Sequence, residues 1–502
     1  MDNLFAALEL VFQVDIILII IAASIYGIIV GAMPGISATL AVAMLVPITY
    51  FMEPVAALAT IATAVAMAIF SGDLPGALLR IPGVPASAAY TEESHEMTLK
   101  GEGGTGLMIS LLCSVIGGIF GTIALALAAP ALAEIALAFR YHEYFWLAAI
   151  GLSTAALVSG NNPLKGLIAL CLGLLLSTVG YDMISGAPRY TFGTVALMEG
   201  INFISVMIGM FAIAEVLRCL THPPRGDGRI SRVQRIDMGA TFRAMWKYKG
   251  KLSMGSIIGV VVGAIPGAGS DIAAWVSFGF SKRLSKTPEL FGTGHPEGIV
   301  AASASNNAST STTWVPSLVF GIPGDSVTAI VIGVLLLKGL EPGPLVFVEN
   351  APLVYSIFVS FFLANLFLIP IGFVSILLAS QILRVPNTAL MPIVLTFTIV
   401  GAFAINNSMI GVIVALVAGI VSFLMQENEY PVAPLILGMV IGPIIEQNFM
   451  QGMIAENGDL LAFFSRPLAA GLGIFTIVIW LVPLLGFAYR HYKTSRTAAA
   501  TF

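Results

Sequence analysis

Apolar segments long enough to cross a membrane recur from one end of this chain to the other. A helix needs about 20 predominantly apolar residues to cross the hydrocarbon core of a bilayer. The chain is 58% hydrophobic and only 10% charged. A membrane β-barrel would instead show short segments of alternating hydrophobicity. We therefore predict an all-α polytopic membrane protein with about 12 membrane passes.

Proline and glycine interrupt these segments in two ordered pairs of motifs. The sequence GAMPG at 31–35 matches GAIPG at 263–267. Pro75 followed by IPG at 81–83 matches Pro316 followed by IPG at 322–324. The spacing between the prolines is the same in both copies of the second motif. This order predicts a duplicated chain with broken or re-entrant helices, in which the second copy carries an insertion around 281–297.

A strongly basic segment at 222–251 separates the two copies. Loops rich in Lys and Arg remain on the cytoplasmic side of a membrane. We interpret this segment as a solvated cytoplasmic loop rather than a nucleic-acid-binding region. The basic C-terminal tail is predicted to be cytoplasmic for the same reason. The predicted organisation is a first transmembrane repeat at 1–221, the basic loop at 222–251, a second repeat at 252–488 and a tail at 489–502.

The distribution of charge also suggests how the two repeats are oriented. The N-terminal segment is acidic and holds no Lys or Arg before Arg80, so it does not fit a secretory signal, and we expect its apolar segment to stay in the mature protein. If this segment begins outside and residue 252 begins inside, the repeats are inverted, as in many secondary transporters. Lys282, Arg283 and Lys286 leave an alternative open, because a cytoplasmic position for them would make 253–281 a re-entrant hairpin instead of a crossing.

The stretch from Ala301 to Thr328 is the most polar part of the apolar sequence, and reads AASASNNASTSTTWVPSLVFGIPGDSVT. A polar group without a partner costs about 2–7 kcal/mol in an apolar medium. Non-helical backbone at membrane depth persists only where protein buries it or where it lines a wet cavity. We therefore expect this stretch to face the inside of the helix bundle and to form half of a substrate site.

The four breaks are candidates for ion binding because each is followed by small hydroxyl or acidic residues. The N-terminus of a half-helix attracts anions through its free N–H groups and dipole, and the free carbonyls at the opposite end suit Na⁺. Asp73, Asp271 and Asp325 are ionisable groups near membrane depth and are functional candidates for that reason. The predicted substrate- and ion-binding residues are Gly35, Ser37, Thr39, Gly83, Ser87, Gly267, Ser270, Asp271, Asn306, Asn307, Ser309, Thr310, Thr312, Gly324, Asp325, Ser326 and Thr328.

Two structural alternatives apply to these residues. Pro-Gly breaks can be simple kinks with Ser and Thr used for packing between helices, and any of the three aspartates can be a helix cap. A sodium ion near Asp271, Asn307 or Asp325 is the corresponding functional hypothesis. Enzymatic function is not expected: the chain holds no phosphate-binding Gly-x4-Gly-Lys-Ser/Thr motif, and its histidines and cysteines have no metal-binding spacing.

Several motifs together resemble the large membrane subunit of the tripartite tricarboxylate transporters, the TctA family. They are the paired GAxPG breaks, NNAST at 306–310, FGIPGDS at 320–326, LKGLEPGP at 337–344 and PRYTFG at 188–193. The likeness extends from about residue 15 to 485. Two places depart from the family pattern. Arg80 stands where the family commonly has Asn, and EESHE occupies 92–96 where small residues are usual.

The resemblance implies a bacterial inner-membrane secondary transporter that takes up tri- or dicarboxylates. It further implies a periplasmic solute-binding protein, a small transmembrane subunit, and a sodium or proton gradient as the driving force, with no other cofactor. Two alternatives from other classes remain. One is an ion channel, which would need a continuous polar pore, and the other is a membrane assembly subunit that does not transport.

Overall fold

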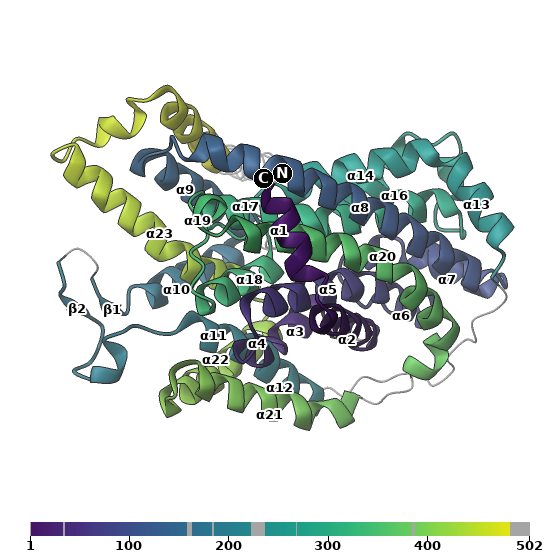
Figure 1. The fold of residues 1–502 in the computed structure, drawn as a ribbon, viewed down its shortest axis with the longest axis horizontal. Helices are drawn as coiled ribbons and strands as arrows, with labels where there is room; N and C mark the ends of the chain where they lie inside the picture. Colours follow the sequence, from purple (N-terminus) through teal and green to yellow (C-terminus); the bar gives the residue numbers. More distant parts are fainter. Residues whose placement is uncertain are drawn as a thin grey trace, which may run out of the picture.

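The computed structural model describes residues 2–33, 36–157, 163–182, 185–221, 236–267, 269–383 and 387–481 (Figure 1). These residues are mostly helical, and the described strands form one short antiparallel pair, β1 (Gly180–Tyr181) with β2 (Pro188–Arg189). This confirms the prediction of an all-α fold. In Figure 1 the β1–β2 hairpin projects from one side of the helical body.

The helices of the first half are separated by short breaks. Their bounds are α1 (Asp2–Val11), α2 (Val14–Gly31), α3 (Ala38–Ala43), α4 (Val46–Tyr50), α5 (Pro54–Ser71), α6 (Asp73–Leu79), η1 (Ser87–Ala89), α7 (Thr91–Leu99), α8 (Gly103–Ala136), α9 (Tyr141–Leu157), α10 (Pro163–Ser177), η2 (Val195–Leu197), α11 (Phe203–Ile208), the π-helical η3 (Gly209–Ile213) and α12 (Ala214–Thr221).

The second half follows a similar pattern. Its elements are α13 (Met238–Lys247), α14 (Lys249–Gly263), α15 (Gly269–Arg283), η4 (Pro288–Leu290), α16 (Pro296–Thr312), α17 (Trp314–Phe320), α18 (Ser326–Leu337), α19 (Val346–Glu349), α20 (Ala351–Ile382), α21 (Asn387–Asn406), α22 (Met409–Glu427), α23 (Ala433–Ala455) and η5 (Leu460–Phe464).

Within the described part of the chain, seven helical segments are long and apolar enough to cross a membrane. They are Val14–Gly31, Pro54–Leu79, Gly103–Ala136, Phe203–Thr221, Ala351–Ile382, Met409–Glu427 and Ala433–Ala455. Other apolar sequence forms shorter helices, at Ala38–Tyr50, Leu164–Ser177, Ser326–Leu337, Met391–Ala404 and Pro467–Leu481. The chain is therefore a multi-pass membrane protein, and many of its apolar residues lie in half-length helices.

The segment predicted as a basic loop contains regular structure. Helix α13 lies inside it and packs on α8, and α14 already begins at Lys249. Asp237 initiates α13 because its carboxylate accepts a hydrogen bond from the Ala240 N–H at 2.9 Å. The segment predicted as a basic cytoplasmic loop thus contains a helix at 238–247, and 222–235 lie outside the described residues.

Helices α14 and α15 form a hairpin whose two ends meet. Near the start of α14, the Lys251 ammonium donates to the carbonyl of Ser281, near the end of α15, at 2.9 Å. The same ammonium lies 3.0 Å from the Glu297 carboxylate at the start of α16. Each arm has 15 residues, or about 22 Å at 1.5 Å per residue, which is less than the roughly 30 Å of a hydrocarbon core. The chain therefore leaves this hairpin at the end where it entered, which favours the re-entrant alternative.

Close contacts recur at matching places in the two halves. A Cβ atom on Gly31 of α2 would lie 2.3 Å from the Ser71 Oγ on α5. A Cβ atom on Gly263 of α14 would lie 2.3 Å from the Thr312 Oγ1 on α16. One turn earlier on α2 and α14, a similar close contact joins Gly27 to Ala64 of α5 and Gly259 to Ser305 of α16. Small residues let the helix backbones approach closely, so α2 packs on α5 as α14 packs on α16.

The two longest described helices, α8 and α20, pack against each other and run in opposite directions. Gly118 of α8 touches Asn365 of α20, while Leu111, earlier on α8, touches Gly372, later on α20. Helix α16 lies against α8, and all its residues from Glu297 to Thr312 are buried. Helices α5 and α16 thus occupy the interior, while two outer groups combine α9 and α10 with α23, and α11 and α12 with α21 and α22 (Figure 1).

Candidate functional site

The breaks predicted from Pro and Gly are real ends of helices. Helix α6 ends at Leu79, and Arg80 adopts a left-handed backbone conformation with φ of 59°. Helix α17 ends at Phe320, and Gly321 adopts the same conformation with φ of 67°. In both copies the chain then turns back on the helix that it has just left.

The returning chain touches the point where each helix pair is broken. A Cβ atom on Gly83 would lie 2.6 Å from the Cα atom of Gly72, between α5 and α6. A Cβ atom on Gly324 would lie 2.5 Å from the carbonyl oxygen of Thr313, between α16 and α17. Glycine is required at both positions because no side chain fits there.

Three of the four breaks are brought together at the start of α15. A Cβ atom on Gly269 would lie 3.0 Å from the Cβ atom of Asp325. Asp271, two residues further on, lies beside the Ala86 backbone and faces the Asp325 carboxyl. Asp271 is an exposed residue of the structure and Asp325 is half-buried. The fourth break leads into α3, which packs on α18, the helix that Asp325 begins.

Asp325 acts as a helix cap, which was the structural alternative for it. Its Oδ1 accepts a hydrogen bond from the Thr328 N–H at 2.8 Å, and the Thr328 Oγ1 accepts from the Asp325 N–H at 2.8 Å. Ser87 binds the Val84 carbonyl at 2.8 Å in the corresponding turn of the first half. Ser37 caps α3 through the Leu40 N–H at 3.2 Å. The hydroxyl residues after the breaks therefore order the starts of the following helices.

The hydroxyl groups of α16 are mostly satisfied by their own helix. Ser309 and Thr310 both donate to the Asn306 carbonyl, at 2.8 and 2.9 Å, and Thr312 donates to the Ala308 carbonyl at 3.2 Å. Such bonds are the usual arrangement of Ser and Thr within a helix. The prediction that this stretch faces the interior agrees with its burial, and the packing alternative accounts for these three hydroxyls.

The two asparagines of α16 differ from the hydroxyl residues around them. Asn306 is 1% exposed and Asn307 is 2% exposed. Neither side-chain polar atom of Asn306 makes a hydrogen bond of ordinary geometry in the described chain, and neither does the Oδ1 of Asn307. A buried polar atom without a partner costs about 1–3 kcal/mol. These amides are therefore available to a ligand.

The remaining predicted site residues are distributed around this region. Gly267 is buried with φ of 79°, and Ser270 is buried at the start of α15. Thr39 and Ser326 are half-buried on α3 and α18. Gly35 lies outside the described residues, as does Pro34.

Asp73 has polar contacts that its sequence position did not reveal. It is 2% exposed, and its Oδ1 accepts a hydrogen bond from the Tyr90 hydroxyl at 2.7 Å. Its Oδ2 accepts a hydrogen bond from the Ser110 hydroxyl on α8. Both bonds come from side-chain hydroxyls of other elements and not from the backbone N–H groups of α6. Tyr90 and Ser110 were missed because they meet Asp73 only after α7 and α8 have folded back.

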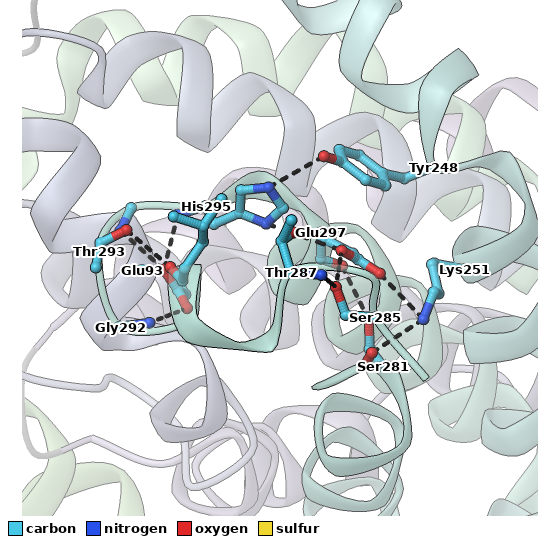
Figure 2. A network of polar contacts seen from close by, with 12 residues as sticks. Glu93, Tyr248, Lys251, Ser281, Ser285, Thr287, Gly292, Thr293, His295 and Glu297 are labelled. Carbon is cyan, nitrogen blue, oxygen red and sulfur yellow. Dashed lines mark hydrogen bonds and ion pairs between the residues drawn. The ribbon is translucent and has the colours of Figure 1, made fainter. Parts of the chain in front are cut away.

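A second polar network lies at the start of α16 and is shown in Figure 2. The Glu93 carboxylate, from α7, accepts hydrogen bonds from the N–H groups of Gly292, Gly294 and His295, at 2.5, 2.9 and 2.8 Å. The His295 Nε2 lies 3.1 Å from the Tyr248 hydroxyl. Burial lowers the pKa of His295 below its usual value. This network ties the first half of the chain to the insertion of the second.

The two departures from the family pattern contact each other. Arg80 occupies the left-handed backbone region, which Asn adopts more readily than other non-glycine residues. Its guanidinium forms an ion pair with Glu92 at 2.6 Å, within the EESHE segment. Glu93, the next residue, supplies the network of Figure 2. The departures therefore form one local structure.

Comparison with known proteins agrees with these features. Residues 17–437 match the model of the Tripartite tricarboxylate transporter TctA family. The chain is 36% identical over 461 residues to an uncharacterized 52.8 kDa protein in the TAR-I ttuC' 3'region of Agrobacterium vitis, covering 91% of each. It is 34% identical over 228 residues to an uncharacterized protein in the TAR-II ttuC' 3'region of the same organism, covering 45% of this chain and 94% of that one. No solved structure matches. The chain belongs to the tripartite tricarboxylate transporter TctA family.

Proposed function

We propose that this chain is the large transmembrane permease subunit of a secondary transporter that takes up tri- or dicarboxylates. Uptake uses a Na⁺ or H⁺ gradient across the bacterial inner membrane, with the C-terminus of the chain in the cytoplasm. Membership of a tripartite family implies a binding protein and a small subunit as partners. In this proposal the binding protein is periplasmic and delivers the carboxylate, and the small subunit is a membrane protein.

The observation that carries the proposal is the meeting of broken helices around Gly269 and Asp325. Backbone N–H groups at the start of α15 can bind a carboxylate substrate. Asp271 and Asp325 would repel that substrate unless a cation neutralises them. A site that combines an anionic substrate with two carboxylates therefore favours simultaneous binding of a cation, which is the basis of coupled transport.

The proposal takes the two repeats to be inverted, as the charge distribution of the sequence suggests. The matching Gly31–Ser71 and Gly263–Thr312 contacts relate the halves, and α8 runs antiparallel to α20. In transporters built from inverted repeats, the substrate site lies between the repeats at discontinuous helices. The meeting of breaks from both halves near Asp325 fits that position.

Reconstituted uptake tests the proposal directly. Proteoliposomes that contain this chain and the small subunit are given the purified binding protein, labelled tri- or dicarboxylates, and either a Na⁺ or a pH gradient. We expect accumulation that requires the binding protein and one of the gradients. Gradient-dependent accumulation would exclude a channel, and binding-protein-dependent uptake with no membrane protein other than these two subunits would exclude a non-transporting assembly role.

Substitutions test the site within the same assay. Asn307→Ala removes an available buried amide, and Gly324→Leu forces a side chain into the Thr313 backbone. We expect both variants to insert into the membrane and to lose uptake. Gly279→Leu on α15 is the control, because a Cβ atom there meets nothing within 4 Å. Normal uptake by both site variants would refute the site.

A further inference from the structure

We propose that Asp73, Tyr90, Ser110 and Asn306 form a Na⁺ site where α5 breaks into α6. The role of this ion in coupling rests on the proposed function, but its binding can be measured without transport. The four side chains come from the α6 N-terminus, the turn before α7, α8 and α16. All four are at most 2% exposed.

The first argument is the charge of a deeply buried carboxylate. Among the described residues, no Lys, Arg or His forms an ion pair with Asp73, and its polar contacts are the neutral hydroxyls of Tyr90 and Ser110. An ionised carboxylate far from water is strongly disfavoured unless a cation accompanies it. A bound monovalent cation would supply the missing charge.

The second argument is the supply of oxygen ligands around that carboxylate. Hard cations are held by carboxylate, carbonyl and hydroxyl oxygens. The Tyr90 and Ser110 hydroxyls each donate to Asp73 and keep lone pairs that can face a cation. Asn306 lies beside the Tyr90 hydroxyl, and its amide makes no hydrogen bond of ordinary geometry in the described chain. The side-chain Oδ1 of Asn306 is thus an available ligand, and it comes from the second half of the chain.

The third argument comes from the matching position in the second half. Gly72 and Thr313 match each other, because each is the residue that the returning chain touches. The residue after Gly72 is Asp73, and the residue after Thr313 is Trp314. Trp314 is fully buried and packs edge-on against Phe361, with ring centroids 5.1 Å apart. The second half therefore has a packed aromatic ring, Trp314, at the position where the first half has the carboxylate of Asp73.

A site of this kind would couple ion binding to the position of α16. Asp73, Tyr90 and Ser110 belong to the first half, whereas Asn306 belongs to the second and stands next to Asn307 of the substrate region. A cation that draws Asn306 toward Asp73 would order α16 against α6 and α8. Ion binding and substrate binding would then stabilise the same arrangement of the two halves.

The experiment uses the purified full chain in detergent, without substrate or binding protein. The unfolding midpoint is measured while NaCl replaces choline chloride at constant ionic strength, and bound radioactive sodium is measured in parallel. We expect a saturable rise in the midpoint with Na⁺, because a ligand that binds the folded state stabilises it. Asp73→Asn should abolish the rise and the sodium binding. Ser110→Ala should raise the apparent Kd at least about tenfold, the lower end of the cost of losing even an outer-shell partner of a metal.

A matched variant separates ion binding from packing. Ser114→Ala removes another buried hydroxyl from α8, about one turn further along, which contacts the Ser303 carbonyl instead of Asp73. It should keep the wild-type Kd for Na⁺. If Asp73→Asn fails to fold, Tyr90→Phe and Ser110→Ala carry the test through their Kd values.

Three outcomes would overturn the site. They are an unchanged response to Na⁺ in both Asp73→Asn and Ser110→Ala, an equal loss in Ser114→Ala, and a wild-type chain that responds to protons but not to Na⁺. The proposed function fails separately. If reconstituted uptake is absent while the Na⁺ response depends on Asp73, the site stands without the function. If a pH gradient drives uptake and the purified chain does not respond to Na⁺, the proposed function stands and the Na⁺ site is refuted.

Discussion

The backbone of Gly83 passes so close to Gly72 that a Cβ atom on Gly83 would lie 2.6 Å from the Gly72 Cα atom. Gly324 stands in the same relation to Thr313, with 2.5 Å to its carbonyl oxygen. Both of these atoms belong to the backbone, so no rotation of a side chain can relieve the contact. Each returning loop is therefore seated on a broken helix, and the loops position the starts of the helices that form the candidate site.

Adding one methyl group at either contact should destabilise the chain. We expect Gly83→Ala and Gly324→Ala each to lower the free energy of unfolding by about 1–3 kcal/mol, the usual cost of overpacking. Thermal unfolding of the purified protein measures this. Gly250→Ala on α14 is the control, because a Cβ atom there has open space. Equal midpoints for Gly324→Ala and Gly250→Ala would contradict the close contact.

Loss of the Glu93 charge should loosen the insertion before α16. Glu93→Gln keeps the shape of the side chain but weakens the bonds from three backbone N–H groups. Because Glu93 is fully buried, we expect a loss of about 1–3 kcal/mol in unfolding free energy. Glu92→Gln breaks only an exposed ion pair with Arg80 and should cost about 0–1 kcal/mol. The prediction fails if the two neighbouring variants unfold at the same temperature.

Lys251 should contribute more to the free energy of unfolding than an ordinary surface lysine. Lys251→Gln leaves Glu297, whose side chain is 5% exposed, without its cation. Removing one partner of a buried pair costs about 3–5 kcal/mol, and the Lys251 side chain is partly exposed, so we expect about 3 kcal/mol. The double variant Lys251→Gln, Glu297→Gln should recover part of this loss. A double variant as unstable as the sum of the single ones would show that the charges do not interact.

Acidification should destabilise the chain through His295. Burial lowers the pKa of His295 in the folded protein, so the unfolded chain binds a proton at a higher pH than the folded chain does. Stability is then fully present above the unfolded pKa of about 6.5 and falls as the pH drops below it. We expect His295→Gln to show a smaller fall in unfolding midpoint between about pH 7.5 and pH 5.5 than the wild type does. Parallel pH profiles for the two proteins would contradict this assignment.

The breaks of the fold were predictable because proline and glycine act on the backbone locally. GAMPG and GAIPG mark the ends of α2 and α14, and the two IPG motifs follow the ends of α6 and α17. The length of the apolar segments predicted the membrane-crossing helices less well. Segments such as Ser326–Leu337 are apolar because protein surrounds them, and hydropathy alone does not separate such half-helices from full crossings.

The site was predictable only where its residues are neighbours in sequence. The run from Asn306 to Thr313 indicated an inward-facing polar stretch, and it is buried. The sequence could not show that the helix satisfies its own hydroxyls, because that depends on rotamers. Nor could it pair Asp73 with Ser110 or Glu93 with Gly292, since those contacts depend on how α7, α8 and the insertion fold together.

The hairpin of α14 and α15 has a consequence for how the chain is assembled in the membrane. Its ends meet at Lys251 and Ser281, so a hairpin that re-enters the membrane from one side would add no net translocation event, and the segments after it would keep the same orientation before and after it inserts. Gly255, Gly259 and Gly263 on its first arm pack against α16, which is synthesised after the hairpin. We therefore expect the hairpin to seat late in biogenesis, after the topology of its neighbours has been decided.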